Sequence, residues 1–176
     1  SAPVESTAAY VRQSDLAQER VWHCVRLTNT TQFPWTTGSA LVISDGKPIA
    51  GSVVEYTAKS GSVEVRLTAA TDIAADRDEV EVSRQAGARV FSRSTYDAVT
   101  VEGTLRMRNF KDKPVTVSIT KLLTGEVVEK SDAGKSVALA TGRGAVNPSS
   151  KIEWEIPLRP GEEKTVTYRY RIYVRG

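Results

Sequence analysis

Residues 26–34 read RLTNTTQFP, and residues 106–114 read RMRNFKDKP. Each stretch ends a run typical of a β-strand on an asparagine, crosses four residues and reaches a proline, and the two agree at Arg, Asn and Pro. A near-repeat of this size predicts two small β-units in tandem or two halves of one double sandwich. The alternative is chance similarity between strand–turn–strand segments. Asparagine at a strand end commonly closes a turn with its own side chain, so we assign Asn29 and Asn109 to architecture.

From Glu19 onward, short segments of the chain alternate apolar and polar residues. Residues 63–67 (VEVRL) and 115–120 (VTVSIT) have the period of two that a half-buried strand requires. Turn signals such as Asp45-Gly46 recur about every 8 to 12 residues, and no long amphipathic helix is predicted. We therefore predict an all-β fold, an antiparallel β-sandwich made of two immunoglobulin-like halves in tandem.

The near-repeat divides the chain into three predicted parts. Residues 1–18 are polar and are expected to form an N-terminal tether or a short helix. Residues 19–84 are expected to form the first β-sandwich half and residues 85–176 the second, with the boundary near residues 83–88.

A further prediction concerns which strands of the two halves correspond. The Gly-, Ala- and Ser-rich segment 131–150 is expected to be a long loop with a short strand near residues 137–139. If that loop is an insertion, residues 63–67 correspond to residues 152–156. Residues 80–82 then correspond to residues 166–170.

Composition limits the function classes. The 176 residues carry 24 Lys and Arg against 21 Asp and Glu with both signs interspersed, so nucleic-acid binding is not predicted. No run approaches the roughly 18 apolar residues of a membrane span, so membrane insertion is not predicted. The chain starts at Ser1 and has no signal peptide, which we interpret as a fragment or processed form of a longer protein. One cysteine fits both the cytosol and an extracytoplasmic compartment, the periplasm or cell envelope, and we favour the latter.

The sequence offers no catalytic constellation. His23 is the only histidine and Cys24 the only cysteine, which excludes triads and zinc sites built from several such residues. Both lie in a predicted strand beside Trp22, where we expect a structural histidine and a buried structural thiol. We predict that the chain is not an enzyme, and we assign it no catalytic, cofactor-binding or metal-binding residue and no cofactor.

Two groups of acidic residues allow alternative interpretations. Residues 72–79 hold Asp at 72, 76 and 78 and Glu at 79, an oxygen-rich cluster of the kind that binds calcium between strands. It lacks EF-hand spacing, and a solvated loop is the preferred interpretation. Glu153 and Glu155 share one face of a predicted strand, where we expect ordinary cross-strand pairs with Arg or Lys on neighbouring strands.

Two glycine-containing stretches resemble parts of a phosphate-binding loop. Residues 142–145 (GRGA) lack the Gly-Lys-Ser/Thr ending of a P-loop. Residues 134–136 (GKS) have that ending, but Glu129 stands where the motif needs its first glycine. We therefore assign neither stretch to phosphate.

Aromatic residues are the remaining candidates for binding. In the last strand Tyr168 and Tyr170 share one face while the intervening arginines share the other. Such a strand can offer a stacking platform for bases or sugars. We favour a core position for the tyrosines, and we expect Trp35 to plug one end of the sandwich.

The chain from about residue 19 to residue 176 resembles the C-terminal β-rich domain of unknown function of mucoidy-inhibitor-A-like bacterial proteins. The motifs that carry the resemblance are VRLTNT at 25–30, TGSALV at 37–42, AG at 50–51, GTL at 103–105, RN at 108–109, KPVTV at 113–117, WEIPLRPGE at 154–162 and YRY at 168–170. The resemblance implies a coiled-coil region upstream of the β domain. It implies no activity and no catalytic residue.

These observations favour a non-catalytic structural or protein-interaction module of a larger bacterial protein. Its partner is expected to be another protein or a neighbouring domain of the same chain, met by loops at the sandwich ends, especially residues 29–37 and 131–150. The alternative is a carbohydrate-binding β-sandwich module. Exposure of Trp35, Trp154 or the tyrosines on a flat or grooved face favours that alternative, and their burial counts against it.

Overall fold

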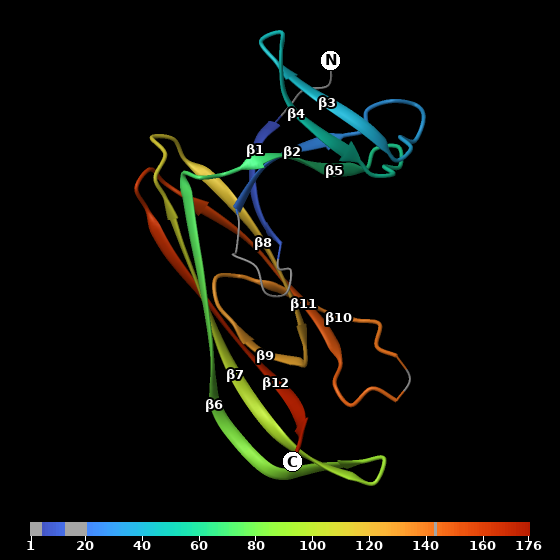
Figure 1. Cartoon of the computed structure of the whole chain (residues 1–176), viewed down its shortest axis with the longest axis vertical. Coiled ribbons are helices and arrows are strands. Elements are labelled where there is room, and N and C mark those ends of the chain that lie inside the picture. Colours follow the sequence, from blue (N-terminus) through green and yellow to red (C-terminus); the bar gives the residue numbers. More distant parts are fainter. Residues whose placement is uncertain (1–4, 13–20, 143) are drawn as a thin grey trace.

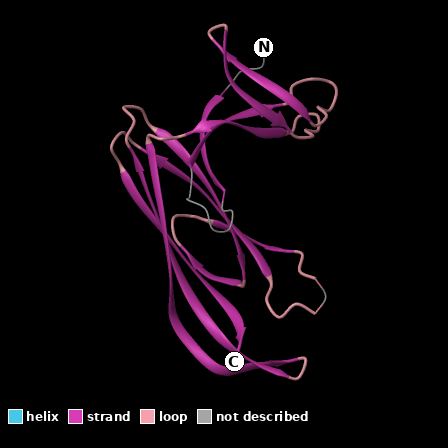
Figure 2. Ribbon diagram, in the orientation of Figure 1, coloured by secondary structure: helices cyan, strands magenta, loops and turns pink. Residues whose placement is uncertain are grey.

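Strands account for all the regular structure in the described part of the chain. The computed structural model describes residues 21–142 and 144–176, and the backbone of residues 5–12. The strands are β1 (Glu5–Arg12), β2 (Val21–Thr28), β3 (Gly38–Ser44), β4 (Lys47–Val54), β5 (Ser62–Ala69), β6 (Ile73–Phe91), β7 (Ser94–Asn109), β8 (Val115–Thr124), β9 (Glu126–Lys130), β10 (Lys135–Leu139), β11 (Ser149–Leu158) and β12 (Glu163–Arg175). The predicted all-β fold is confirmed (Figure 2).

The strands form three sheets. One has six strands in the order β10-β11-β8-β1-β2-β5, one has four in the order β6-β7-β12-β9, and β3 pairs with β4 alone as a hairpin. In Figure 1 the long strands β6, β7 and β12 run down the lower part of the molecule, and the β3–β4 hairpin lies at the opposite end. All named pairs are antiparallel except β1 with β8, which is parallel. The layered antiparallel arrangement is consistent with the predicted β-sandwich.

Strand register supports a genuine duplication. Trp35 forms an isolated bridge with Thr57, and Val115, 80 positions after Trp35, pairs with Leu158, 101 positions after Thr57. The same two offsets relate the next pairs: Gly38–Val54 to Ser118–Glu155, Ser39–Val53 to Ile119–Trp154, Ala40–Ser52 to Thr120–Glu153 and Leu41–Gly51 to Lys121–Ile152. We call β2–β5 the first unit, and β7, β8, β11 and β12 with the intervening β9 and β10 the second unit.

The register corrects the predicted correspondence between the halves. Thr28 pairs with Ser62 in the first unit and Arg108 with Glu163 in the second, so β5 corresponds to the start of β12. Residues 63–67 therefore match residues 164–168 rather than 152–156. Residues 80–82 lie in β6, which pairs with β7, and do not match residues 166–170.

The predicted correspondence was wrong because the second unit carries its inserted residues between β8 and β11. The first unit joins β3 to β4 through a tight turn at Asp45-Gly46, whereas the second unit inserts β9 and β10 between β8 and β11. The chain crosses from the six-stranded to the four-stranded sheet at Gly125, whose φ is 143°. A Cβ there would lie 2.6 Å from the Arg171 carbonyl oxygen, so the crossing requires glycine. The predicted short strand near residues 137–139 is confirmed as β10.

Two predicted boundaries also differ from the structure. Residues 5–12 form strand β1 rather than a tether or short helix, because they pair with both β2 and β8; the rest of the predicted tether, residues 1–4 and 13–18, lies outside the described residues. The expected boundary at residues 83–88 falls inside β6, a 19-residue strand with register shifts near Glu81 and Gln85. The alternation that marks a strand was present there, but bulges interrupt its period.

Asn109 anchors the corner of the second unit. Its side chain is fully buried. The amide Nδ2 donates to the carbonyl oxygens of Lys113 at 2.8 Å and Arg159 at 3.1 Å, while Oδ1 accepts the Lys111 N–H at 2.9 Å. One side chain thus holds the turn that follows β7 against the turn between β11 and β12.

Asn29 repeats this network in the first unit. Its Nδ2 donates to the carbonyl oxygens of Phe33 at 2.8 Å and Thr57 at 3.2 Å, and Oδ1 accepts the Thr31 N–H at 3.0 Å. Asn29 is also buried. The predicted role of both asparagines in closing their turns is confirmed, and each also reaches a second turn far along the chain.

Most residues of the hydrophobic core come from the second unit. The buried members of the core are Val21, Ala70, Ile73, Leu105, Met107, Val115, Val117, Ile119, Ile152, Trp154, Ile156, Leu158, Val166 and Tyr168. Only Val21 comes from a strand of the first unit, and Ala70 from just after it. The two units therefore share strand order and corner chemistry, but the second holds most of the packed interior.

We expect Asn109→Ala to lower the free energy of unfolding by about 3 kcal/mol, because it leaves buried carbonyl groups without their donor. Urea unfolding followed by tryptophan fluorescence measures the change. Asn109→Asp keeps the acceptor and the shape but loses the donating amide, and is expected to destabilise as much. Asp112→Ala, an exposed change in the same turn, serves as the control and is expected to stay within about 0.5 kcal/mol of the parent. An Asn109→Ala loss no larger than that of the control contradicts the prediction.

Candidate interaction surface

The β3–β4 hairpin exposes a row of apolar side chains. Leu41 is 65% exposed and Val53 54%, and Ile43 and Ile49 are also largely in contact with solvent. The cross-strand pairs and the alternation along each strand place these four side chains on one surface, with Ser39 and Gly51 between them. We call these six residues the hairpin face. A contiguous apolar surface of this kind marks interaction sites in soluble proteins.

The equivalent face of the second unit forms the core. Val53 occupies the position of Trp154, which is 2% exposed, and Gly51 that of Ile152, which is fully buried. In the second unit this side of β8 and β11 packs against β7 and β12. The same strand pattern is therefore covered in one unit and open to solvent in the other.

A charged cluster lies at the Leu41-equivalent position of the second unit. Lys121 is 5% exposed and its Nζ lies 2.7 Å from Glu79 Oε1. The Tyr168 hydroxyl donates to the same oxygen at 2.5 Å, and Lys121 Nζ lies 5.6 Å from the centre of the Tyr168 ring. Gly103 faces that ring, and a side chain there would collide with it. The cluster joins β6, β8 and β12, with Lys121 and Tyr168 buried and Glu79 partly exposed to solvent.

The cluster holds Glu79 in its charged form. Burial acts to raise the pKa of Glu79, but the hydrogen bonds from Lys121 and Tyr168 outweigh it and keep that pKa below the usual value. Burial, together with the bond to Glu79, raises the pKa of the Tyr168 hydroxyl. A neutral donor and a cation around one carboxylate form a satisfied structural ion pair, with no group left poised for proton transfer.

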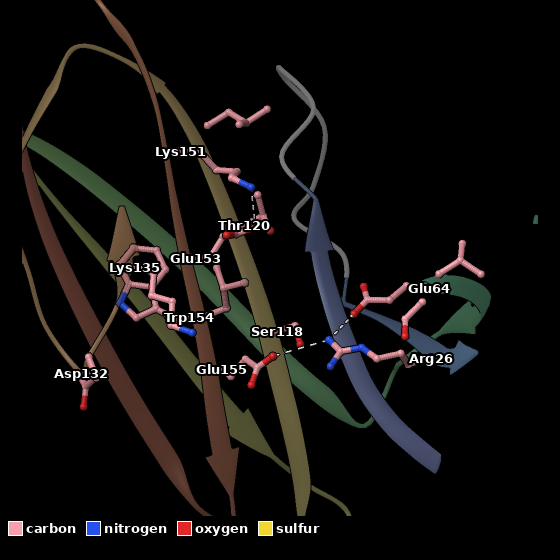
Figure 3. Close-up of a pocket in the computed structure, with 15 residues that line it drawn as sticks. Arg26, Glu64, Ser118, Thr120, Asp132, Lys135, Lys151, Glu153, Trp154 and Glu155 are labelled. Atoms are coloured by element: carbon pink, nitrogen blue, oxygen red, sulfur yellow. Dashed lines mark hydrogen bonds and ion pairs between the residues drawn. The ribbon is translucent and has the colours of Figure 1, made fainter. Parts of the chain in front are cut away.

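The groove in Figure 3 runs over the outer face of the six-stranded sheet. It encloses about 770 Å³. Arg26 at its floor lies 2.8 Å from Glu64 and 3.6 Å from Glu155, and Lys151 lies 2.9 Å from Glu153. Because these charges neutralise one another, the groove presents no field of one sign to a ligand.

The surroundings of His23 and Cys24 are consistent with structural roles for both residues. Cys24 is buried as predicted and forms no disulfide. His23 has Lys111 Nζ at 3.1 Å from its Nε2. Burial and then the Lys111 charge lower the pKa of His23, partly offset by Asp72, so the ring is neutral at pH 7.

The predicted acidic groups take part in ion pairs. Glu155 pairs with Arg26 across the sheet, as expected, but the partner of Glu153 is Lys151 on its own strand. Of the cluster at residues 72–79, Asp76 lies 3.3 Å from Arg106 and Glu79 belongs to the buried cluster. The segment is strand β6 from Ile73 onward rather than a solvated loop. Within the described residues, no three His, Cys, Asp or Glu side chains gather where they would bind a metal ion.

The structure explains the glycine of one of the two glycine-containing stretches by packing. A Cβ at Gly134 would collide with the Trp154 indole, whose Nε1 donates to the Ser131 carbonyl oxygen at 3.0 Å. Gly134 is therefore a packing requirement of the core tryptophan. Of the stretch at residues 142–145, Arg143 lies outside the described residues.

The aromatic residues divide between core and surface. Trp154 and Tyr168 are buried and are 5.9 Å apart between ring centres, and Arg169 between the tyrosines pairs with Glu102 in solvent. Both positions agree with the favoured prediction of a core tyrosine face. Trp35 is partly buried, whereas Phe33 and Tyr56 on either side of its bridge are 76% and 65% exposed.

Comparison with family models, curated proteins and solved structures finds no match to the chain. The surface residues must therefore be interpreted from their geometry alone. Nor does the described part of the chain hold a helix of the length and apolarity that a membrane crossing needs.

Sequence reasoning missed the hairpin face. Its alternating Leu41 and Ile43 have the pattern of a strand with one buried face, and the pattern does not tell whether that face is covered. The only signal that separates the units is the tight turn at Asp45-Gly46, which leaves no residues for a strand equivalent to β9.

Glu79 predicts a pH dependence of stability. Because the folded-state pKa of Glu79 is lowered, its contribution is complete above the unfolded-state pKa of about 4.3 and is lost as the pH falls through the folded-state value. We expect Glu79→Gln to be less stable than the parent at pH 7 and to converge with it near pH 2, as measured by urea unfolding across that range. Glu163→Gln, at an exposed carboxylate that starts β12, is the control and should match the parent throughout. A constant difference between Glu79→Gln and the parent at all pH values would contradict the prediction.

Proposed function

We propose that this chain is a non-catalytic protein-interaction module of a larger bacterial protein and that it contacts its partner through the hairpin face. The observation that carries the proposal is the exposure of Leu41 and Val53 at positions whose equivalents form the core of the second unit. We also propose that both units are immunoglobulin-like. The resemblance to the β-rich domain of mucoidy-inhibitor-A-like proteins agrees with a module attached to other domains.

The charged groups of the chain support a non-catalytic role. The buried Lys121 is neutralised by the partly exposed Glu79, and the groove over the six-stranded sheet is lined by ion-paired side chains. Catalysis calls for a perturbed group held near a space that a substrate can enter. The partly exposed carboxylate of Glu79 instead has its Oε1 oxygen occupied by two donors, Lys121 and Tyr168.

Carbohydrate binding is the less favoured function. Sugar-binding sandwiches stack exposed aromatic rings against pyranose faces, and two of the candidates, Trp154 and Tyr168, are buried in the core. The exposed rings of Phe33 and Tyr56 lie at the corner of the first unit and are the ones that a glycan array would test.

Site-specific photo-crosslinking tests the proposed surface. p-Benzoylphenylalanine placed at Leu41 or Val53 in the full-length protein, in the cells that produce it, is expected to yield the same discrete crosslinked protein at both positions. Mass spectrometry then identifies that protein. The same group at Val137 on β10, which is 51% exposed and remote from the hairpin in Figure 1, is the matched control.

Substitution then tests whether the contact is apolar. Ile43→Lys, two residues from Leu41 on the same face of β3, is expected to reduce the crosslink at least about tenfold, since burying one large aliphatic side chain contributes about 1.5–3 kcal/mol. Its stability should stay near that of the parent because Ile43 is exposed. Equal crosslinking at positions 41, 53 and 137, or binding of the isolated chain to a glycan with no protein crosslink, overturns the proposal.

A further inference from the structure

We propose that the outer edge of β3 accepts an extended strand from another polypeptide, in the parallel direction in which β1 pairs with β8. The inference rests on the proposed function and specifies the partner of the hairpin face as a β-strand. It follows from the equivalence of β3 with β8 and of β4 with β11, which the strand register establishes.

The β3–β4 hairpin lacks the neighbours that its equivalent strands have. In the six-stranded sheet, β8 lies between β11 and β1, and β11 lies between β8 and β10. Among the strands that the structure describes, β3 and β4 pair only with each other. A two-stranded sheet is marginally stable in water, and an unpaired edge presents backbone donors and acceptors to any extended chain.

The edge of β4 is poorly suited to a further strand. β10 pairs with residues 149–153 of β11, and the equivalents of these residues are residues 48–52 of β4. Pro48 has no N–H to donate, and the register shift between Val42 and Ile43 leaves Ile49 as the extra residue of a bulge on β4. Proline and bulges are features that protect natural edges from pairing.

The edge of β3 carries no such protection. Its seven residues (GSALVIS) include no proline and no charged side chain. β1 pairs with residues 117–120 of β8. By the offset of 80 positions their equivalents are residues 37–40, of which residues 38–40 belong to β3. The position that β1 occupies beside β8 is therefore open beside the first half of β3.

The side chains of β3 define the strand that fits this edge. Leu41 and Ile43 lie on the hairpin face, while Ala40 and Val42 point to the other side and are partly buried. Side chains at the same level of neighbouring strands share a face and contact each other. The partner strand is therefore expected to place β-branched or other apolar residues beside Leu41 and Ile43, and small or apolar residues between them. Backbone pairing along β3 and apolar contact on the hairpin face then act on one ligand.

The sequence of β1 supplies the probe. A synthetic peptide of residues 5–12 (ESTAAYVR), capped at both ends, is titrated to millimolar concentration into the uniformly ¹⁵N-labelled full chain. We expect saturable amide shift changes at Gly38, Ser39 and Ala40. We also expect slower hydrogen exchange for the β3 amides that point to the free edge.

Two methylated peptides separate strand pairing from general stickiness. The N–H groups of a strand point alternately to its two sides, so only every second one can donate to β3. N-methylation at Tyr10 or at Val11 removes one N–H and keeps every side chain. One of these two peptides is expected to bind at least about tenfold more weakly than the parent peptide, and the other within about threefold. Equal affinities of the two methylated peptides overturn the inference, because a non-specific apolar contact would not distinguish adjacent N–H groups.

The remaining outcomes are also decisive. Shift changes confined to β2 and β8 would mean that the peptide only exchanges with the chain's own β1, and would overturn the inference. So would concentration-dependent self-association in analytical ultracentrifugation that protects β3 and blocks the peptide, because a second copy would then occupy the edge. Crosslinking at Leu41 and Val53 together with no peptide binding leaves the proposed function intact and removes the strand partner alone.

Discussion

One buried amide in each unit fixes the path of the chain. The side-chain oxygen of Asn29 and of Asn109 accepts a backbone N–H in the turn that follows. The side-chain amide donates to one carbonyl oxygen in that turn and to another in a turn far along the sequence. A buried carbonyl without a donor is costly, so removing either amide exposes several groups to that cost. The strand order of both units depends on this local geometry, which explains why an asparagine followed five residues later by proline is what the two units retain in common.

The two units differ in what their corners enclose. In the second unit the layers close over Trp154, Ile156 and their neighbours, and the inserted β9 adds a terminal strand beside β12. In the first unit the corner is equally well bonded, but a two-residue turn replaces the insertion and the hairpin remains largely exposed. The two units therefore share their corner hydrogen bonds and strand order, while the burial of the equivalent apolar face differs between them. A fold can be duplicated without duplicating its core.

Local patterns predicted much of this fold. Alternation identified β5 and β8, Asp45-Gly46 identified the hairpin turn, and the near-repeat identified the corners. Three features lay beyond such patterns. β1 forms because residues 5–12 find partners more than 90 positions away in β8, and bulges in β6 disguise its length. The hairpin face has the composition of a core strand, and whether such a face is covered depends on a strand supplied elsewhere.

The placement of β1 has a consequence for how the protein is made. Ala9 pairs in parallel with Val117, 108 positions later, and the β8 strand that holds Val117 is itself paired with β11. During translation, residues 5–12 leave the ribosome before β8 and β11 have been synthesised. Residues 5–12 can therefore take their place beside β8 only after residues 115–124 have been translated, and until then the edge of β1 that faces β8 must avoid misplaced pairings.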